Sequence, residues 1–267
     1  MNDALKNIDM PTLIKLVETQ GKWLAQQQPR RALHEIADMQ QVFETCTSHV
    51  RHELQTALAT MTPGIPLSNA EFDLEVQIRP ERPAYWVADA IDGAVQYLCG
   101  LPLWTITLCL VQDSKPVLAV VHDAANACTY HAQAGLGAYC NDNPLRVATR
   151  SAIEAAFIGT SFPNYPQRPK AEIDDFLLRM ASIIPRVFAQ RWMGPASLSL
   201  SQLAEGKLDG YWETGRSLYD WLPGALIAQE AGARVRGLDG RTFDWDCNGI
   251  LAASPAMYPQ LEKLLAK

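Results

Sequence analysis

Two short acidic segments hold the residues of this chain that are best suited to chemistry. In the first, Asp89 and Asp92 stand three positions apart, directly after the apolar run Tyr85–Ala88. If a buried strand ends at Asp89 and the chain then turns into a helix, both carboxylates point into one cavity, with the carbonyl oxygen of Ile91 between them. Mg²⁺ prefers this mixture of carboxylate, carbonyl and water oxygens. The segment therefore predicts a site for a hard divalent cation.

The residues that follow this segment are suited to binding an anion. A helix that opens at Gly93–Ala94 would aim free backbone N–H groups at a phosphate. A simpler interpretation exists, because Asp-Gly between two apolar runs is also an ordinary turn signal. For the first segment alone, a plain turn remains the alternative to the metal site.

The second acidic segment is Tyr219–Gly224, in which Asp220 stands before a predicted helix. The helical pattern runs from Trp221 to Gly232, with Pro223 in its first turn and Gly232 as its stop. Taken alone, Asp220 has the role of a helix N-cap. The two segments together, in this order and at this separation, favour one metal site that both of them build.

The elements that position these segments can be predicted from hydrophobic periodicity. Amphipathic helical spacing is present over Leu13–Leu24 and again from Met39 to Met61. Strand and turn patterns dominate from Ile65 to near Phe157. Beyond that point the patterns predict a helix over Ile173–Ile184, helices near 195–205, 220–231 and 255–266, and short strands around 209–212 and 249–252.

The chain resembles the inositol monophosphatase superfamily, the Mg-dependent phosphatases of lithium-sensitive type, as a divergent member. That family carries Asp-Pro-(Ile/Leu)-Asp-Gly-Thr at a strand end and, later, Trp-Asp-x-x-(Ala/Pro)-Gly with Glu-Ala-Gly. The corresponding segments here are Asp89–Ala94, Tyr219–Gly224 and Glu230–Gly232. Other segments resemble the family's antiparallel strands, its substrate loop and the strand that ends in a substrate-contacting acid: Trp104–Val111, Pro116–Asp123, Ala134–Asn141, Arg191–Ser197 and Leu208–Glu213.

The resemblance implies a fold and an activity. The expected architecture is an α/β (α+β) layered αβαβα sandwich of the inositol monophosphatase and fructose-1,6-bisphosphatase type. Residues 1–267 are expected to form one unit, whose approximate halves, 1–150 and 151–267, carry the first and the second acidic motif. The expected activity is hydrolysis of a phosphate monoester, with Mg²⁺ as the cofactor.

The resemblance also implies roles for single residues in binding the metal. The expected ligands are the side chains of Glu71, Asp89, Asp92 and Asp220, together with the Ile91 carbonyl. Glu71 and Asp92 are the expected catalytic residues among them.

Two of the implied acidic positions have open alternatives. Glu71 stands in a degraded form of the family's Gly-Glu-Glu motif, so Asp73 or Glu75 can take its place, and a solvated loop acid is the plainer interpretation. Asp38 resembles an early aspartate of the family, and a plain surface acid explains it equally well.

Substrate contacts are implied at three further places. The backbone N–H groups of Gly93 and Ala94 are expected to bind the phosphate, and those of Gly194 and Ala196 to approach the substrate. Glu213 resembles the acid that binds substrate hydroxyls, although an acid at a strand end can also simply face water.

Ala94 is the main departure from the family, which has threonine at this position. The family's threonine holds the attacking water together with the upstream glutamate, whereas alanine keeps the backbone N–H and lacks the hydroxyl. Loss of a positioned proton-relay group costs on the order of 10²–10⁴ in rate. Gln96 and Thr214 are the polar residues that we consider as substitutes.

Composition excludes several other classes of protein. The net charge of −6 argues against a nucleic-acid-binding surface. No apolar run approaches the roughly 18 residues of a membrane helix, so no membrane association is expected. The six cysteines form no C-x-x-C pair, which predicts reduced thiols and a cytoplasmic location.

Two functional hypotheses follow. The first is a Mg²⁺-dependent phosphomonoesterase acting on a small polyol or sugar phosphate, with inositol 1-phosphate as the default and histidinol phosphate, fructose 1,6-bisphosphate or 3′-phosphoadenosine 5′-phosphate as alternatives. The second is a weakened or inactive family member that acts as a binding or regulatory protein. Ala94 favours the second hypothesis, and the retained Asp89, Asp92 and Asp220 favour the first. A homodimer is expected, because family members are often dimers.

Overall fold

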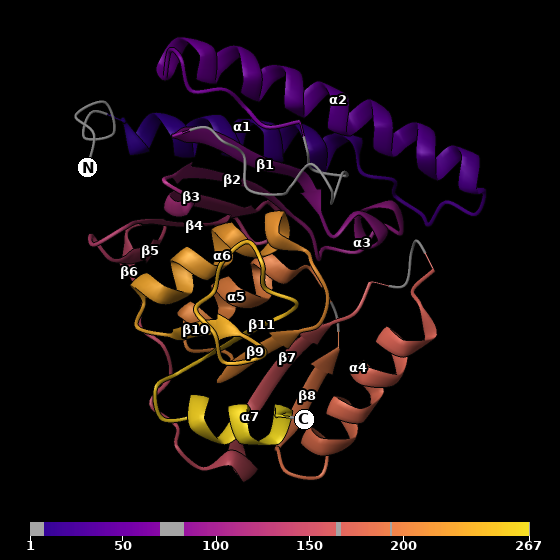
Figure 1. The fold of residues 1–267 in the computed structure, drawn as a ribbon. Helices are drawn as coiled ribbons and strands as arrows, with labels where there is room; N and C mark the ends of the chain where they lie inside the picture. The colour runs from indigo at the N-terminus through magenta and orange to yellow at the C-terminus, as the bar shows by residue number, and fades with distance from the viewer. Residues whose placement is uncertain (1–7, 70–82, 164–166, 193, 267) are drawn as a thin grey trace.

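The computed structural model describes residues 8–69, 83–163, 167–192 and 194–266. Layers of helices alternate with two β-sheets along the long axis of the molecule (Figure 1). Helices α1 (Met10–Gln27) and α2 (Ile36–Met61) cover the outer face of the first sheet. The helices between the sheets are α5 (Ala196–Ala204) and α6 (Leu218–Glu230), and those on the far side are α4 (Lys170–Ile183) and α7 (Tyr258–Leu265). The predicted αβαβα sandwich is confirmed.

The first sheet is an antiparallel meander. Its strands pair in sequence order, and the short helix α3 (Ala94–Leu98) follows the first of them. The strands are β1 (Ala84–Asp92), β2 (Thr105–Gln112), β3 (Lys115–Asp123), β4 (Cys128–Gln133), β5 (Ala138–Cys140) and β6 (Asn143–Pro144). The strand-rich region predicted up to Phe157 is therefore present, and the start of its helix at Ala94 was also anticipated.

The second sheet has the order β10-β11-β9-β7-β8, in which β8, β7 and β9 are parallel neighbours. Its strands are β7 (Phe157–Ser161), β8 (Ala189–Trp192), β9 (Gly210–Glu213), β10 (Arg234–Gly237) and β11 (Ile250–Ala253). The strands predicted around 209–212 and 249–252 match β9 and β11. The prediction omitted β7, β8 and β10. Strands β8 and β10 are short and keep exposed or half-exposed residues, so their sequences lack a continuous apolar signal.

Helix α6 begins earlier than its sequence pattern indicated. Its first residue is Leu218 and its N-cap is Ser217, whose carbonyl accepts the N–H of Asp220 at 3.1 Å and of Trp221 at 3.1 Å. The prediction that Asp220 precedes the helix as its N-cap is therefore wrong. Asp220 lies within the first turn, and Pro223 lies inside the helix.

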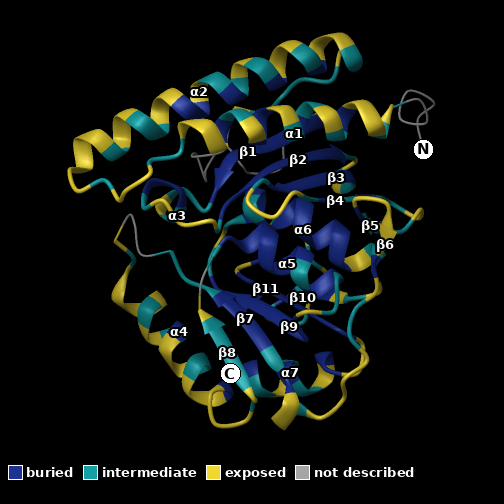
Figure 2. Cartoon of the chain, turned by 180° about the vertical axis from the view of Figure 1, so that it is seen from behind, coloured by how far each residue is buried: buried dark blue, intermediate teal, exposed yellow. Residues whose placement is uncertain are grey.

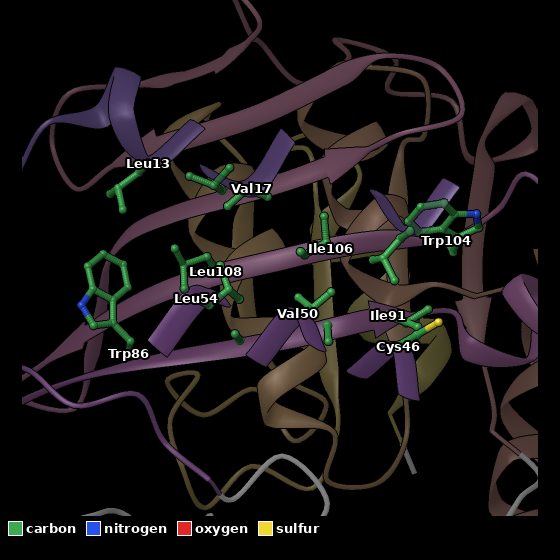
Figure 3. Close-up of a cluster of buried hydrophobic side chains, with 14 of the residues drawn as sticks. Leu13, Val17, Cys46, Val50, Leu54, Trp86, Ile91, Trp104, Ile106 and Leu108 are labelled. Carbon is green, nitrogen blue, oxygen red and sulfur yellow. The ribbon is translucent and has the colours of Figure 1, made fainter. Parts of the chain in front are cut away.

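Strand β1 separates two apolar clusters by simple alternation. Trp86 points to the α1–α2 side (Figure 3), and Ala88 belongs to the same cluster. Tyr85 and Val87 pack against α6. Among the apolar residues of the predicted first helix, Leu13, Val17 and Leu24 are fully buried in the α1–α2 cluster. Leu16 and Trp23 are half-buried and pack against it. Strands and the helices between the sheets are the most deeply buried elements (Figure 2). Because side chains alternate along a strand, Asp89 points to the same side as Tyr85 and Val87, toward α6.

Helices α5 and α6 approach each other closely at Gly224. A Cβ atom on Gly224 would lie 2.6 Å from the Cβ of Leu200 and 3.0 Å from the Ser197 carbonyl oxygen. We expect Gly224→Ala to lower the free energy of unfolding by about 1–3 kcal/mol, because overpacking forces the two helices apart. Urea denaturation measures this change. Gln229→Ala, on the exposed part of the same helix, should leave the midpoint nearly unchanged, and an equal effect of both substitutions would contradict the packing argument.

Two of the compositional expectations can be compared with the structure. The six cysteines are free thiols, as predicted. Within the ranges that the structure describes, none of the helices combines the length and the apolar character needed to cross a membrane.

Candidate functional site

The two aspartates of β1 reach the same side of the sheet because the strand is irregular between them. Asp89 pairs with Thr107 and Asp92 pairs with Thr105, so three steps along β1 match two steps along β2. In a regular strand, residues three apart point to opposite faces. The extra residue forms a β-bulge, which restores both carboxylates to the face toward α5 and α6.

Hydrogen bonds to residues of β1 and β2 hold Asp89 in place. It is only 8% exposed. Its Oδ1 accepts the N–H of Ile91 at 2.8 Å, and its own N–H donates to Thr107 Oγ1 at 3.2 Å. The Ile91 side chain meanwhile lies in the α1–α2 cluster (Figure 3). The bulge thus buries the Ile91 side chain on the α1–α2 face of the sheet and directs the two carboxylates to the opposite face.

Asp92 is held by the first turn of α5. Its Oδ2 accepts the backbone N–H of Ser197 at 3.0 Å and also the Ser197 hydroxyl. The Ser197 Oγ lies 2.7 Å from Thr105 Oγ1, which completes a buried chain of polar groups. Burial raises the pKa of Asp92 to about 6, and the two hydrogen bonds from Ser197 oppose the rise without cancelling it. A divalent cation at this carboxylate would favour its charged form.

The turn after Asp92 brings α3 close to the loop before α5. Gly93 has φ 94°, and a Cβ there would lie 2.8 Å from the Leu103 carbonyl oxygen, so this position needs glycine. Ala94 is the first residue of α3 and is half-buried. A Cβ on Gly194 would lie 3.5 Å from Ser161 Oγ and 3.6 Å from Gln96 Nε2. The two predicted phosphate segments therefore face a common region together with Gln96.

Glu213 ends β9 and is buried, with 2% of its surface exposed. The alternative that it simply faces water is wrong. Its Oε2 accepts hydrogen bonds from the Tyr211 hydroxyl and from Trp221 Nε1, the latter at 3.0 Å. Burial raises the pKa of Glu213 to about 7. The hydrogen bonds from Tyr211 and Trp221 lower it, the charge of Asp92 raises it further, and Arg168 lowers it.

Asp220, from the other half of the chain, shares this electrostatic environment. It is half-buried in the first turn of α6. Burial is the main cause of the raised pKa of Tyr211, and the charges of Glu213, Asp92 and Asp220 raise it as well. The acidic groups of β1, β9 and α6 therefore act on one phenol between the two sheets.

The remaining predicted residues are placed as follows. Ala196 begins α5 behind Pro195, which has no N–H to offer a substrate. Asp38 is exposed in the first turn of α2, which fits a plain surface acid. Glu71, with its alternatives Asp73 and Glu75, lies outside the described residues. Within the described ranges, no three His, Cys, Asp or Glu side chains form a group that could hold a metal ion.

The residues that support the acids were not among the predicted site residues. Ser197 and Thr105 hold Asp92, whereas Tyr211 and Trp221 hold Glu213. A signal existed for Tyr211, which stands two positions before Glu213 in a strand and so shares its face. For Ser197 the signal was weaker, because only its place at a helix start suggested a polar contact.

Comparison with known proteins identifies the class of fold first. The chain superposes on an inositol monophosphatase from Thermotoga maritima with a TM-score of 0.81, at 20% identity over 96% of both chains. The model of the inositol monophosphatase family matches residues 14–267. The chain therefore belongs to the inositol monophosphatase family.

Individual relatives carry two kinds of name. An inositol-1-monophosphatase of Mesorhizobium japonicum is 31% identical over 182 residues, which cover 68% of this chain and 67% of the relative. A putative Nus factor SuhB of Neisseria meningitidis is 32% identical over 181 residues, which cover 68% of each chain. Membership thus supports phosphatase chemistry and leaves the substrate open.

Proposed function

We propose that this protein is a Mg²⁺-dependent phosphomonoesterase that hydrolyses a small polyol or sugar phosphate, with inositol 1-phosphate as the first substrate to test. The observation that carries this proposal is the β-bulge of β1, which turns Asp89 and Asp92 toward the helix that bears Asp220. Family membership supports the reaction class.

The donor types of the residues proposed to hold the metal suit a hard divalent cation, although Asp89, Asp92 and Asp220 do not by themselves form a three-ligand group in the described ranges. Asp89, Asp92, Asp220, Glu71 and the Ile91 carbonyl supply oxygen atoms only, which is what Mg²⁺ requires. When bound, Mg²⁺ activates the attacking water and stabilises the leaving oxygen. The raised pKa of Asp92 supports the proposal, because a buried carboxylate gains most from a nearby cation.

The chain's own residues bind and orient the phosphate. The N–H groups of Gly93 and Ala94 face the anion at the start of α3, and the backbone of Gly194 and Ala196 approaches it from the α5 side. Glu71 and Asp92 are the proposed catalytic residues, whose carboxylates would accept the proton of the attacking water. Glu213 is the proposed partner of substrate hydroxyls.

Phosphate release from a substrate panel tests the proposal. The panel contains inositol 1-phosphate, histidinol phosphate, fructose 1,6-bisphosphate and 3′-phosphoadenosine 5′-phosphate, each with Mg²⁺ and with a chelator. We expect release that depends on Mg²⁺ from at least one substrate. A folded protein that releases phosphate from none of them would overturn the proposal.

A second candidate is a catalytically weakened member that binds a partner. Ala94 favours it, because the hydroxyl of the family motif is missing at the first residue of α3. The relative named a putative Nus factor SuhB also favours this candidate. Replacement of Ala94 by threonine distinguishes the two candidates.

We further propose a cytoplasmic homodimer. Large apolar side chains are exposed on α4 and at its end, with 70% of Leu178 and 56% of Ile184 accessible. Such residues are enriched at protein interfaces when they form a patch. Light scattering of the purified protein measures the oligomeric state directly.

Ser197 is expected to act as a positioning residue for Asp92. Ser197→Ala removes the hydroxyl that donates to Asp92 and keeps the backbone N–H. We expect Mg²⁺ affinity and kcat/KM to fall by about 10-fold, within the roughly 10–100-fold range of partners that orient metal ligands. Calorimetry with Mg²⁺ and steady-state kinetics measure the two effects.

The matched control is Ser199→Ala on the same helix. The Ser199 hydroxyl donates to the Pro195 carbonyl at 3.0 Å instead of to Asp92. It should leave the Mg²⁺ affinity unchanged. Equal losses in both variants would show that α5 packing, and not the bond to Asp92, is responsible.

A further inference from the structure

Tyr219 stands directly before Asp220 and joins α6 to a distant segment of the chain. Its ring is buried, with 2% of its surface exposed, and belongs to one apolar cluster with Tyr85 and Val87 of β1. Its hydroxyl lies 2.7 Å from the Oγ of Ser68, a residue 151 positions away. Two hydroxyls at this distance form a hydrogen bond. The family motif has tryptophan at this position, which has no hydroxyl to make the bond.

Ser68 belongs to a short segment that pairs with β1. The Ser68 N–H donates to the Trp86 carbonyl at 2.8 Å, and the Trp86 N–H donates to the Pro66 carbonyl at 2.8 Å. Leu67 forms a parallel bridge with Trp86 between these two bonds. Strand β1 is at the end of its sheet and has β2 on one side, so the segment occupies the side that β2 leaves open. The position of Ser68 is therefore tied to β1.

Helix α2 holds the same segment. Arg51 Nη2 donates to the Ser68 carbonyl at 2.7 Å and to Asn69 Oδ1 at 3.1 Å. Hydrogen bonds donated by a charged guanidinium are stronger than those between neutral groups. Ser68 is thus a point at which three elements meet, with β1 and α2 bound to its backbone and α6 bound to its hydroxyl.

The first turn of α6 needs a contact of this kind. The helix begins after Ser217, whose carbonyl accepts backbone N–H groups of the turn, and the Ser217 side chain makes no capping hydrogen bond within the described chain. A helix end without a side-chain cap keeps unpaired N–H groups and frays more readily. Asp220 lies in this turn. The bond from Tyr219 to an anchored segment therefore limits the movement of the carboxylate next to it.

The ring and the hydroxyl of Tyr219 constrain the helix in different ways. Apolar packing is non-directional, so the ring can fill its place beside β1 without fixing how α6 is rotated about its axis. A hydrogen bond requires a short distance and a limited range of angles. Because Asp89 lies on the α6 face of β1, rotation of α6 changes the separation between the Asp89 and Asp220 carboxylates. The hydroxyl is thus the part of Tyr219 that fixes this separation.

We propose that Tyr219 is a positioning residue for the metal site: its hydrogen bond to Ser68 fixes the first turn of α6 against β1 and so places the Asp220 carboxylate where it can share a cation with β1. This inference rests on the proposed metal-dependent function and adds a residue to it. Tyr219 acts through Asp220 and not by contact with the cation or the substrate.

Calorimetry with Mg²⁺ tests this inference without requiring turnover. Tyr219→Phe removes the hydroxyl and keeps the ring. We expect its Mg²⁺ affinity to fall by about 5-fold, which is the effect of one typical hydrogen bond. The kcat/KM for a hydrolysed substrate should fall by a similar factor.

Tyr85→Phe is the matched control. Tyr85 lies in the same apolar cluster, and its buried hydroxyl lacks a hydrogen-bond partner among the described residues. Removal of this hydroxyl should leave the Mg²⁺ affinity unchanged. Equal losses in Tyr85→Phe and Tyr219→Phe would assign the effect to packing of the cluster and overturn the inference.

Ser68→Ala removes the other partner of the same hydrogen bond. We expect the loss of Mg²⁺ affinity to match that of Tyr219→Phe, with no further loss when the two substitutions are combined, because both remove one shared interaction. Additive losses would overturn the inference. If Tyr219→Phe does not fold, Ser68→Ala compared with Tyr85→Phe gives the same test.

Binding and turnover together separate this inference from the proposed function. Weaker Mg²⁺ binding by Tyr219→Phe, in a protein that releases phosphate from no substrate, would reject the phosphatase and retain the positioning role. Mg²⁺-dependent phosphate release, with affinity and kcat/KM unchanged in Tyr219→Phe, would retain the phosphatase and overturn the positioning role. An unmodified protein that binds no Mg²⁺ would overturn both.

Discussion

Asp220→Asn is expected to abolish Mg²⁺-dependent phosphate release. The substitution removes one charged ligand and keeps the shape of the side chain in the first turn of α6, where it is half-buried. Metal ions contribute several kcal/mol to stabilising the transition state. Each factor of ten in rate corresponds to about 1.4 kcal/mol, so we expect a loss of roughly 10³-fold or more. Steady-state phosphate release and Mg²⁺ calorimetry measure the two consequences.

The control for Asp220→Asn is the same substitution at an aspartate outside the proposed metal site. Asp174 on α4 is paired with Lys170, and half of its side chain is exposed. Asp174→Asn should leave both the rate and the Mg²⁺ affinity unchanged. A rate near that of the unmodified protein for Asp220→Asn would remove α6 from the proposed metal site.

Ala94→Thr is expected to raise the rate of phosphate release by about 10²-fold. The added hydroxyl stands at the first residue of α3, directly after the Asp92–Gly93 turn. A positioned proton-relay group contributes on the order of 10²–10⁴ in rate, and we take the lower end because the neighbouring side chains are adapted to alanine. Ala94 is half-buried and packs at the edge of the α1–α2 cluster.

Ala94→Val is the matched control, because valine has the shape of threonine and lacks the hydroxyl. The hydroxyl is responsible only if threonine increases the rate and valine does not. If both variants fold and neither releases phosphate faster than the unmodified protein, the binding or regulatory candidate is favoured. A gain with both would mean that side-chain volume at α3 controls the rate.

Local patterns in the sequence predicted much of the fold. The apolar spacing of Leu13, Val17 and Leu24 defines a helix face whichever element covers it, and that face is buried as expected. The start of strand β1 was equally clear, since a run of β-forming apolar residues precedes Asp89. The predicted end at Asp89 was wrong, because β1 continues to Asp92. The layered arrangement of these elements came from the resemblance to a family, because periodicity does not fix which elements pack together.

Features that depend on pairing between distant segments were not predictable. The bulge between Asp89 and Asp92 exists only in the register of β1 against β2. The burial of Glu213 depends on Trp221, which belongs to a different element, and so its exposure could not be read from a strand end. In the same way, the bond between Ser197 and Asp92 joins residues 105 positions apart. The start of α6 was misjudged because Leu218 and Tyr219 are apolar residues that suit a strand as well as a helix.

A crystal structure of the protein soaked with Mn²⁺ and phosphate, with anomalous scattering to locate the metal, addresses the shared site most directly. We expect a Mn²⁺ peak in contact with carboxylate oxygens of both β1 and α6, with phosphate beside the N–H groups of Gly93 and Ala94. Manganese bound elsewhere, or by one of the two elements alone, would contradict the account.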